Sequence, residues 1–268
     1  MQKHLVVLDL DGTLLTNDKT IAHQTKQTLL QAKDEGHHVM IATGRPYRAS
    51  APFYEELGLV TPIVNFNGAF VHHPFNTNWQ TFHQPIDLSV VHDVVSSIHA
   101  YEYENLLAEI KDDVYIHRED DWMSPLYAMG NPLVRIGDLR DTLPADPTSL
   151  LISANEINVP IIRNHLQAVH AEVIEHRRWG APFPLIEIVK KGLNKAVGID
   201  LVAKELGIPR ERIIAFGDED NDLEMLEYAG VGVAMGNAID CVKNIANEIT
   251  LSNEENGIAV ILQERLKL

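Results

Sequence analysis

Short apolar runs alternate with amphipathic segments at both ends of the chain. In the first eighty residues, apolar runs at 5–10, 38–44 and 62–70 are separated by segments 21–36 and 47–58, whose apolar positions recur with a helical period. Strands that alternate with helices in this way predict a parallel sheet with right-handed crossovers.

The same alternation returns after residue 190. Segments 194–208 and 222–230 are predicted helices, and 212–218 and 231–236 are predicted buried strands. The intervening stretch is richer in aromatic residues, Pro and His. We therefore expect an α/β fold with a doubly wound parallel sheet, formed by residues 1–82 and 188–268. An inserted α+β domain, residues 83–187, would interrupt it.

Composition excludes several classes of protein. The chain has 268 residues and a formal net charge of -16, which argues against binding to nucleic acid or to an anionic membrane. No apolar stretch approaches the ~20 residues of a membrane span, and the first apolar run is too short for a signal peptide. The single cysteine, Cys241, fits a reducing compartment, and we expect it to be a small buried residue. These features predict a soluble, cytoplasmic protein.

Polar side chains follow several of the predicted strands. Asp9 and Asp11 close the first strand, Thr43 the second, and Asp218 a strand near the C-terminus. Ligands of open α/β sheets bind at the carboxyl ends of the strands. Asp222 lies one helical turn after Asp218 and should face the same edge. Four converging carboxylates need a cation, and ligands that are all oxygen favour Mg²⁺.

Each of these motifs has a simpler interpretation when it is taken alone. Residues 9–13 could form an Asp-Gly turn with solvated acids, and residues 217–222 could cap a helix. Thr43 could be a cap or an ordinary strand residue, and Lys195 a solvated helix residue. Asn67 and Gly68 fit a plain turn and the rim of a site equally well. Only the combination of these motifs, in this order, favours catalysis.

In its ordered motifs the chain resembles the phosphatases of the haloacid dehalogenase superfamily, specifically the Cof type with a large C2 (IIB) cap. The matching motifs are DLDGT (9–13), ATGR (42–45), Lys195 within KKGLNKA, and GDEDND (217–222), with AMGNA (234–238) downstream. They span nearly the whole chain. One position departs from the family pattern, because Ala196 stands where a Gly usually follows the motif Lys.

The resemblance implies a role for each matching residue. Asp9 would be the nucleophile that forms an aspartyl phosphate, and Asp11 the general acid and base. Asp218 would bind Mg²⁺ together with Asp9 and the backbone carbonyl of Asp11, supported by Asp222. Thr43 and Lys195 would also be catalytic, and Lys195 would supply positive charge to Asp9 and the phosphoryl group. The residues that would contact the phosphate are Leu10, Thr43, Gly44, Arg45, Lys195 and Asn221.

Three functions remain compatible with the sequence. The first is a Mg²⁺-dependent phosphatase of small phosphorylated metabolites, such as sugar phosphates. The second is a phosphotransferase or phosphomutase of the same superfamily, and the third is a non-catalytic sugar-phosphate sensor. The complete set of Asp9, Asp11, Lys195 and Asp218 argues against the sensor. The sequence is compatible with a monomer or a homodimer, and it leaves the physiological substrate open.

Overall fold

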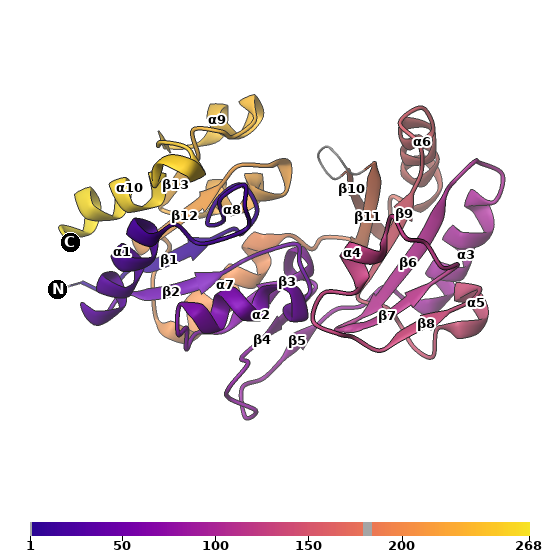
Figure 1. The fold of residues 1–268 in the computed structure, drawn as a ribbon, viewed down its shortest axis with the longest axis horizontal. Helices are drawn as coiled ribbons and strands as arrows, with labels where there is room; N and C mark the ends of the chain where they lie inside the picture. Colours follow the sequence, from indigo (N-terminus) through magenta and orange to yellow (C-terminus); the bar gives the residue numbers. More distant parts are fainter. Residues whose placement is uncertain (1, 179–183) are drawn as a thin grey trace. The chain divides into compact units, whose positions relative to one another are not determined.

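The computed structural model describes residues 2–178 and 184–268, which divide into two compact units (Figure 1). The core unit consists of the chain up to Arg45 together with Ser50–Thr81 and Asn194–Leu268. The inserted unit consists of Phe82–Leu193 together with Pro46–Ala49.

The core unit is built on a parallel sheet whose strand order is β14-β13-β12-β1-β2. Every residue of β1 is fully buried, as expected of a strand in a parallel sheet with both faces covered. Helices α1 and α10 pack together, as do α7 and α8. The helices and strands outside Phe82–Leu193 are β1 (Leu5–Leu8), α1 (His23–Asp34), β2 (His38–Ile41), α2 (Tyr47–Glu56), β3 (Ile63–Asn65), η1 (Phe66–Gly68), β4 (Phe70–His72), α7 (Lys195–Leu206), η2 (Arg210–Arg212), β12 (Ile213–Gly217), η3 (Asp220–Asp222), α8 (Leu223–Tyr228), β13 (Val231–Ala234), α9 (Asp240–Ile245), β14 (Glu248–Ile249), η4 (Asn253–Glu255) and α10 (Gly257–Leu266).

The inserted unit has its own sheet, with strand order β10-β11-β9-β6-β7-β8. Neighbouring strands are antiparallel, except that β7 and β8 run parallel. Its helices and strands are β5 (Phe82–His83), α3 (Leu88–Ile98), β6 (Asn105–Ile110), β7 (Asp113–Ile116), α4 (Ser124–Tyr127), β8 (Val134–Ile136), α5 (Leu139–Thr142), β9 (Ser149–Ser153), α6 (Asn158–His170), β10 (Ile174–Arg178) and β11 (Leu185–Lys190).

Alternation along the strands gives the inserted sheet two apolar faces. Leu106 and Ile152 pack with residues of α3, α5 and α6 in one buried cluster. Leu107 and Leu151, which point to the opposite face, pack with Met123 just before α4. The inserted unit therefore has a hydrophobic core of its own.

These observations confirm the expected fold class, a doubly wound α/β core with an inserted α+β unit. The predicted strand over 62–70 is divided in two, because Asn67 and Gly68 adopt positive φ and form a turn between β3 and β4. The expected burial of Cys241 is wrong, since this residue is exposed on α9. Within the described residues, no helix is both long and apolar enough to cross a membrane.

Candidate active site

Three carboxylates meet at one edge of the core sheet. Asp9 directly follows β1 and Asp218 directly follows β12, and these two strands are parallel neighbours, so both side chains lie at the carboxyl edge of the sheet. Asp222 ends the short helix η3 after Asp218. One carboxylate oxygen from each of the three lies within 4.8 Å of the others, and all three residues are buried. Asp9, Asp218 and Asp222 therefore converge as predicted, but the prediction of four converging carboxylates is wrong, because the carboxylate of Asp11 pairs with Arg45 and Lys19 and does not join this cluster.

A lysine ammonium lies between two of these carboxylates. Lys195 is fully buried, and its Nζ lies 2.6 Å from Asp9 Oδ1 and 2.6 Å from Asp222 Oδ1. It is the first residue of α7, a helix capped by Asn194, whose side chain accepts a hydrogen bond from the amide of Val197. The simpler interpretation of Lys195 as a solvated helix residue is therefore wrong.

Asp218 and Asp222 make further short contacts. Asp222 Oδ2 accepts hydrogen bonds from the backbone amides of Asp218, at 2.9 Å, and Glu219, at 3.1 Å. Asp218 Oδ1 accepts a hydrogen bond of 2.7 Å from the hydroxyl of Thr13. A Cβ at Gly12 would lie 2.2 Å from Asp218 Oδ2, so only glycine permits this approach. The turn after β1 thus packs directly against Asp218.

The cluster carries more negative charge than Lys195 can balance. Burial raises the pKa of Asp9 to about 7, with Lys195 opposing that rise and the charge of Asp222 adding to it. Burial also raises the pKa of Asp218 to about 8, and the charges of Asp9 and Asp222 act in the same direction. Burial alone would lower the pKa of Lys195, but Asp222 and Asp9 raise it above its usual range. A bound cation would relieve the repulsion among the carboxylates.

The donor set fits a hard divalent cation. Asp9, Asp218 and Asp222 offer only oxygen atoms, which suit Mg²⁺ or Ca²⁺ rather than softer metals. Their spacing lets a single ion contact more than one of them. Because the carboxylates are buried, neutralisation of their negative charge by a cation is favourable.

Asp11 lies in a different electrostatic environment. Its carboxylate binds Arg45 through two hydrogen bonds, of 2.6 Å from Nε and 2.7 Å from Nη2, and Lys19 Nζ lies 2.7 Å from Oδ1. Burial would raise the pKa of Asp11, but the hydrogen bonds and charges of Arg45 and Lys19 lower it to about 2. Lys19 was not expected at the site, and no motif in the sequence distinguishes it.

The residues expected to contact phosphate lie around the second strand end. Thr43 is buried, and its Oγ1 accepts a hydrogen bond of 3.1 Å from the amide of Arg45. Asn67 Oδ1 accepts a hydrogen bond of 3.1 Å from the side chain of Asn221. Asn67 also closely approaches Gly44, since a Cβ there would lie 3.1 Å from Asn67 Nδ2. Asn67 is therefore both part of a turn and a neighbour of two predicted site residues.

Leu10 can offer polar contacts only through its backbone, because its side chain is apolar and lies in the buried core. The sequence also did not single out the side chain of Thr13, although this residue belongs to the quoted DLDGT motif.

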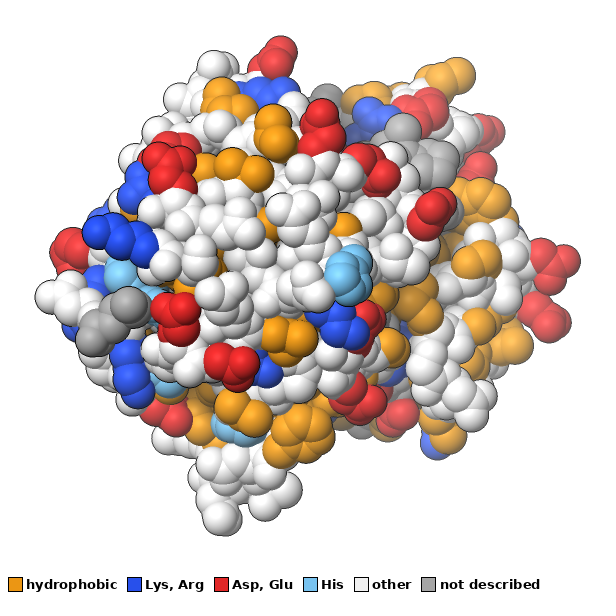
Figure 2. Space-filling model, turned by 60° about the vertical axis from the view of Figure 1, so that its left-hand side comes forward, with side chains coloured by type: hydrophobic (Ala, Val, Ile, Leu, Met, Phe, Trp, Pro, Cys, Tyr) orange, Lys and Arg blue, Asp and Glu red, His pale blue; other side chains and the backbone are white. Residues whose placement is uncertain are grey.

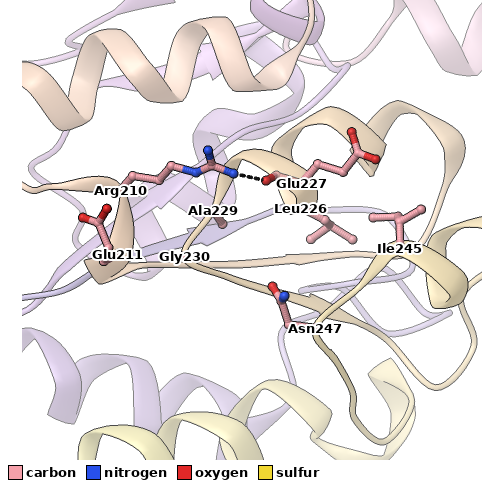
Figure 3. Close-up of a pocket in the computed structure, with 8 residues that line it drawn as sticks. All are labelled: Arg210, Glu211, Leu226, Glu227, Ala229, Gly230, Ile245 and Asn247. Atoms are coloured by element: carbon pink, nitrogen blue, oxygen red, sulfur yellow. Dashed lines mark hydrogen bonds between the residues drawn. The ribbon is translucent and has the colours of Figure 1, made fainter.

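One cavity of the core unit is separate from the carboxylate cluster. This hollow of about 460 Å³ is lined by residues that include Arg210, Gly230 and Asn247, each of which precedes a strand of the core sheet (Figure 3). It therefore lies at the amino ends of β12, β13 and β14, opposite the acids. Figure 3 shows the guanidinium of Arg210 donating to the carbonyl of Glu227.

Comparison with known proteins identifies the class. The profile of the haloacid dehalogenase-like hydrolase family matches residues 6–262. The chain belongs to this family, and it is a phosphatase, as its motifs predicted.

Relatives and solved structures agree with this class. The chain is 55% identical to the 5-amino-6-(5-phospho-D-ribitylamino)uracil phosphatase YitU of Bacillus subtilis, over 99% of this chain and 98% of that protein. It is 28% identical to the pyridoxal phosphate phosphatase YbhA of Escherichia coli, over 99% and 100% of the two chains. The subclass IIB sugar phosphatase BT4131 has the same fold, with a TM-score of 0.84 at 22% identity over the full length of both chains.

Proposed function

We propose that this chain is a Mg²⁺-dependent phosphatase that hydrolyses 5-amino-6-(5-phospho-D-ribitylamino)uracil to the dephosphorylated ribitylaminouracil and inorganic phosphate. The observation that carries this proposal is the 55% identity to YitU, which extends over almost the whole of both chains. The more distant relative named for pyridoxal phosphate shares only 28% of its residues with this chain.

In this proposal Asp9 attacks phosphorus and becomes an aspartyl phosphate, while the oxygen–phosphorus bond to the ribityl group breaks. Asp11 gives a proton to the departing alkoxide and then takes one from the water that hydrolyses the aspartyl phosphate. Lys195 supports these steps, because its ammonium lies 2.6 Å from the Asp9 oxygen and neutralises charge beside the nucleophile.

The proposed phosphate contacts are provided by the turns after the first two strands. Thr43 and the backbone amides of Leu10 and Gly44 would donate to phosphate oxygens. Arg45 would exchange part of its contact with Asp11 for the phosphate, and Asn221 would add a polar contact.

The proposed cation site consists of Asp9, Asp218 and the backbone carbonyl of Asp11, with Asp222 supporting them. Mg²⁺ bound there would supply positive charge to the transferring phosphoryl group. The need for charge compensation among three buried carboxylates supports this assignment. A cytoplasmic location and a monomeric or homodimeric state also remain part of the proposal.

A substrate panel tests the proposal. The purified protein is assayed with Mg²⁺ on the ribitylaminouracil phosphate, on pyridoxal 5′-phosphate and on p-nitrophenyl phosphate. We expect kcat/KM to be highest for the first compound, by about tenfold or more over pyridoxal phosphate, which corresponds to about 1.4 kcal/mol of transition-state stabilisation. Chelation of the metal should stop turnover of all three.

Asp9→Asn is the control for the nucleophile. Asparagine is nearly isosteric with aspartate, so this variant should fold and yet lose turnover of every substrate. A preference for pyridoxal phosphate would contradict the proposed substrate, and full activity of Asp9→Asn would contradict the covalent route. Transfer of phosphate to a second metabolite, in place of its release, would instead indicate a phosphomutase.

A further inference from the structure

The AMGNA motif, residues 234–238, has no part in the chemistry proposed above, yet its asparagine contacts the turn that carries the nucleophile. Asn237 Nδ2 donates a hydrogen bond of 2.8 Å to the backbone carbonyl of Gly12. Gly12 is the residue that packs against the carboxylate of Asp218. The exposed side chain of Asn237 thus binds Gly12, the residue at which the turn after β1 contacts Asp218, a proposed metal ligand. We call this turn, residues 9–15, the nucleophile turn.

A second asparagine fixes the first. The backbone amide of Asn253 donates a hydrogen bond of 3.0 Å to Asn237 Oδ1. The side chain of Asn253 is buried, and its Nδ2 donates a bond of 2.9 Å to the carbonyl of Leu15. Asn237 and Asn253, which we call the asparagine clamp, therefore bind two carbonyls of the same turn, those of Gly12 and Leu15.

The loop that bears Asn237 also holds the segment that carries Asp218. The amide of Met235 donates to the carbonyl of Gly217 at 3.0 Å, and the amide of Ile239 donates to the carbonyl of Asp218 at 3.0 Å. One loop therefore bonds to both segments whose carboxylates form the cluster. A change in this loop would alter the position of Asp218 relative to the turn after β1.

We propose that Asn237 is a positioning residue for the metal site, acting through Gly12 to fix the nucleophile turn against Asp218. This inference rests on the cation site of the proposed function. Residues that orient metal ligands from outside the first coordination sphere commonly change metal affinity 10–100-fold when they are replaced. The asparagine clamp lies outside the proposed coordination sphere in the same way, because it binds the backbone of the nucleophile turn, which packs against Asp218.

The variant Asn237→Asp tests this role with little change in shape. It removes the amide donor that binds the Gly12 carbonyl but keeps an oxygen that accepts from the Asn253 amide. Asn244→Ala, an exposed substitution on α9 in the same unit, is the matched control. The readout is the rise in melting temperature as Mg²⁺ alone is added to metal-free protein, which measures binding without any turnover.

We expect Asn237→Asp to need about tenfold more Mg²⁺ than the wild type for the same rise in melting temperature. Asn244→Ala should match the wild type. At saturating Mg²⁺, the KM of Asn237→Asp for p-nitrophenyl phosphate should stay close to the wild-type value, because the phosphate contacts are unchanged. Asn237→Ala, which introduces no charge, should show the same increase in Mg²⁺ requirement.

Three outcomes would overturn this inference. An unchanged Mg²⁺ requirement in both variants would show that Asn237 does not act on the metal site. Failure of both variants to fold would show that Asn237 supports the fold as a whole. A wild type whose melting temperature does not respond to Mg²⁺ would remove the site on which the inference depends. A wrong substrate assignment would appear only in the substrate panel, since none of these outcomes depends on the natural substrate.

Discussion

The two aspartates of the DLDGT motif have opposite electrostatic surroundings although they are two residues apart. Burial raises the pKa of Asp9 to about 7, whereas Arg45 and Lys19, against the effect of burial, lower that of Asp11 to about 2. Groups with divergent pKa values in one site are a common basis for dividing chemical roles. Asp9 therefore depends on nearby positive charge to stay ionised, while Asp11 is ionised in this conformation and must leave its cationic partners before it can hold a proton.

The raised pKa values predict a pH-dependent stability in the absence of metal. The folded state keeps protons on Asp9 and Asp218 up to pH values of about 7 and 8, whereas the unfolded carboxyls lose theirs near the ordinary aspartate pKa of 3.8. Between these pH values the folded state binds more protons than the unfolded state, so the free energy of unfolding decreases as pH rises. The contribution of Asp9 and Asp218 to stability is therefore complete below their pKa in the unfolded state, and it is lost as pH rises through their pKa in the folded state.

Asp218→Asn isolates this effect from the titration of the histidines. In the presence of a chelator, the melting temperature of the wild type should fall relative to that of Asp218→Asn as pH rises from about 5 to about 8. Calorimetry of both proteins across that range measures the difference. Two curves that run parallel would show that Asp218 does not titrate with a raised pKa in the folded protein.

At the scale of elements, the strands and the acids at their ends could be predicted because their signals are local. A run such as Leu5–Leu8 is apolar throughout, and the position of Asp9 immediately after it places the carboxylate at the sheet edge. The break between β3 and β4 agrees with the turn that the sequence allowed at Asn67 and Gly68, since both residues tolerate positive φ. Periodicity alone merged the two strands.

Contacts between distant segments could not be predicted in the same way. Asn221 reaches Asn67 across 154 positions of sequence. Even the contact of Lys19 with Asp11, eight positions apart, depends on how the chain folds back after the first turn. Asn237 is similar, because its bond to Gly12 joins residues 225 positions apart. Motif matching indicated that these asparagines belong to a family pattern, but only the tertiary structure shows which atoms they bind.

The turn between β3 and β4 controls how α7 begins. A Cβ at Gly68 would lie 2.2 Å from the carbonyl oxygen of Asn194, and Gly68 has φ of +97°. Asn194 caps α7, and Lys195 is the first residue of that helix. Gly68→Ala should therefore displace the start of α7 and with it the ammonium beside Asp9.

Gly207→Ala, at the other end of α7, is a matched control for backbone strain. Gly207 has φ of +65°, but nothing lies within 4 Å of the position that its Cβ would take. We expect Gly207→Ala to cost about 1 kcal/mol of stability and to leave kcat nearly unchanged. Gly68→Ala should cost more and should also lower kcat, as denaturant unfolding and steady-state kinetics would measure. Equal effects of the two substitutions would contradict a role for Gly68 in placing Lys195.

At the scale of the whole molecule, the overall charge opposes the binding of phosphate esters. The formal net charge is -16, and on the face drawn in Figure 2 carboxylates are scattered with lysines and arginines among them. Attraction of an anionic substrate must therefore come from local cations such as Lys195 and Arg45 and from the proposed Mg²⁺. These groups recognise the phosphate, which every candidate substrate shares. Discrimination among substrates must then depend on other residues.

The inserted unit is the expected source of that discrimination. It has its own sheet and apolar clusters, and the core unit retains the fully buried strand β1 and its parallel neighbours. Both parts therefore have the buried apolar surface that an independently folding domain needs. That the inserted unit acts as a separately folding cap remains a prediction.

Replacing Phe82–Leu193 with a short Gly/Ser linker tests this prediction. Circular dichroism and thermal melting should show that the shortened protein folds, because the parallel sheet and the helices α1, α7, α8 and α10 are kept. It should hydrolyse p-nitrophenyl phosphate slowly, since Asp9, Lys195 and Asp218 all belong to the core unit. Its kcat/KM values for natural phosphate esters should become similar to one another, because only the phosphate contacts remain. If the shortened protein folds and still ranks these esters as the full chain does, specificity arises in the core unit and the inserted unit has another role.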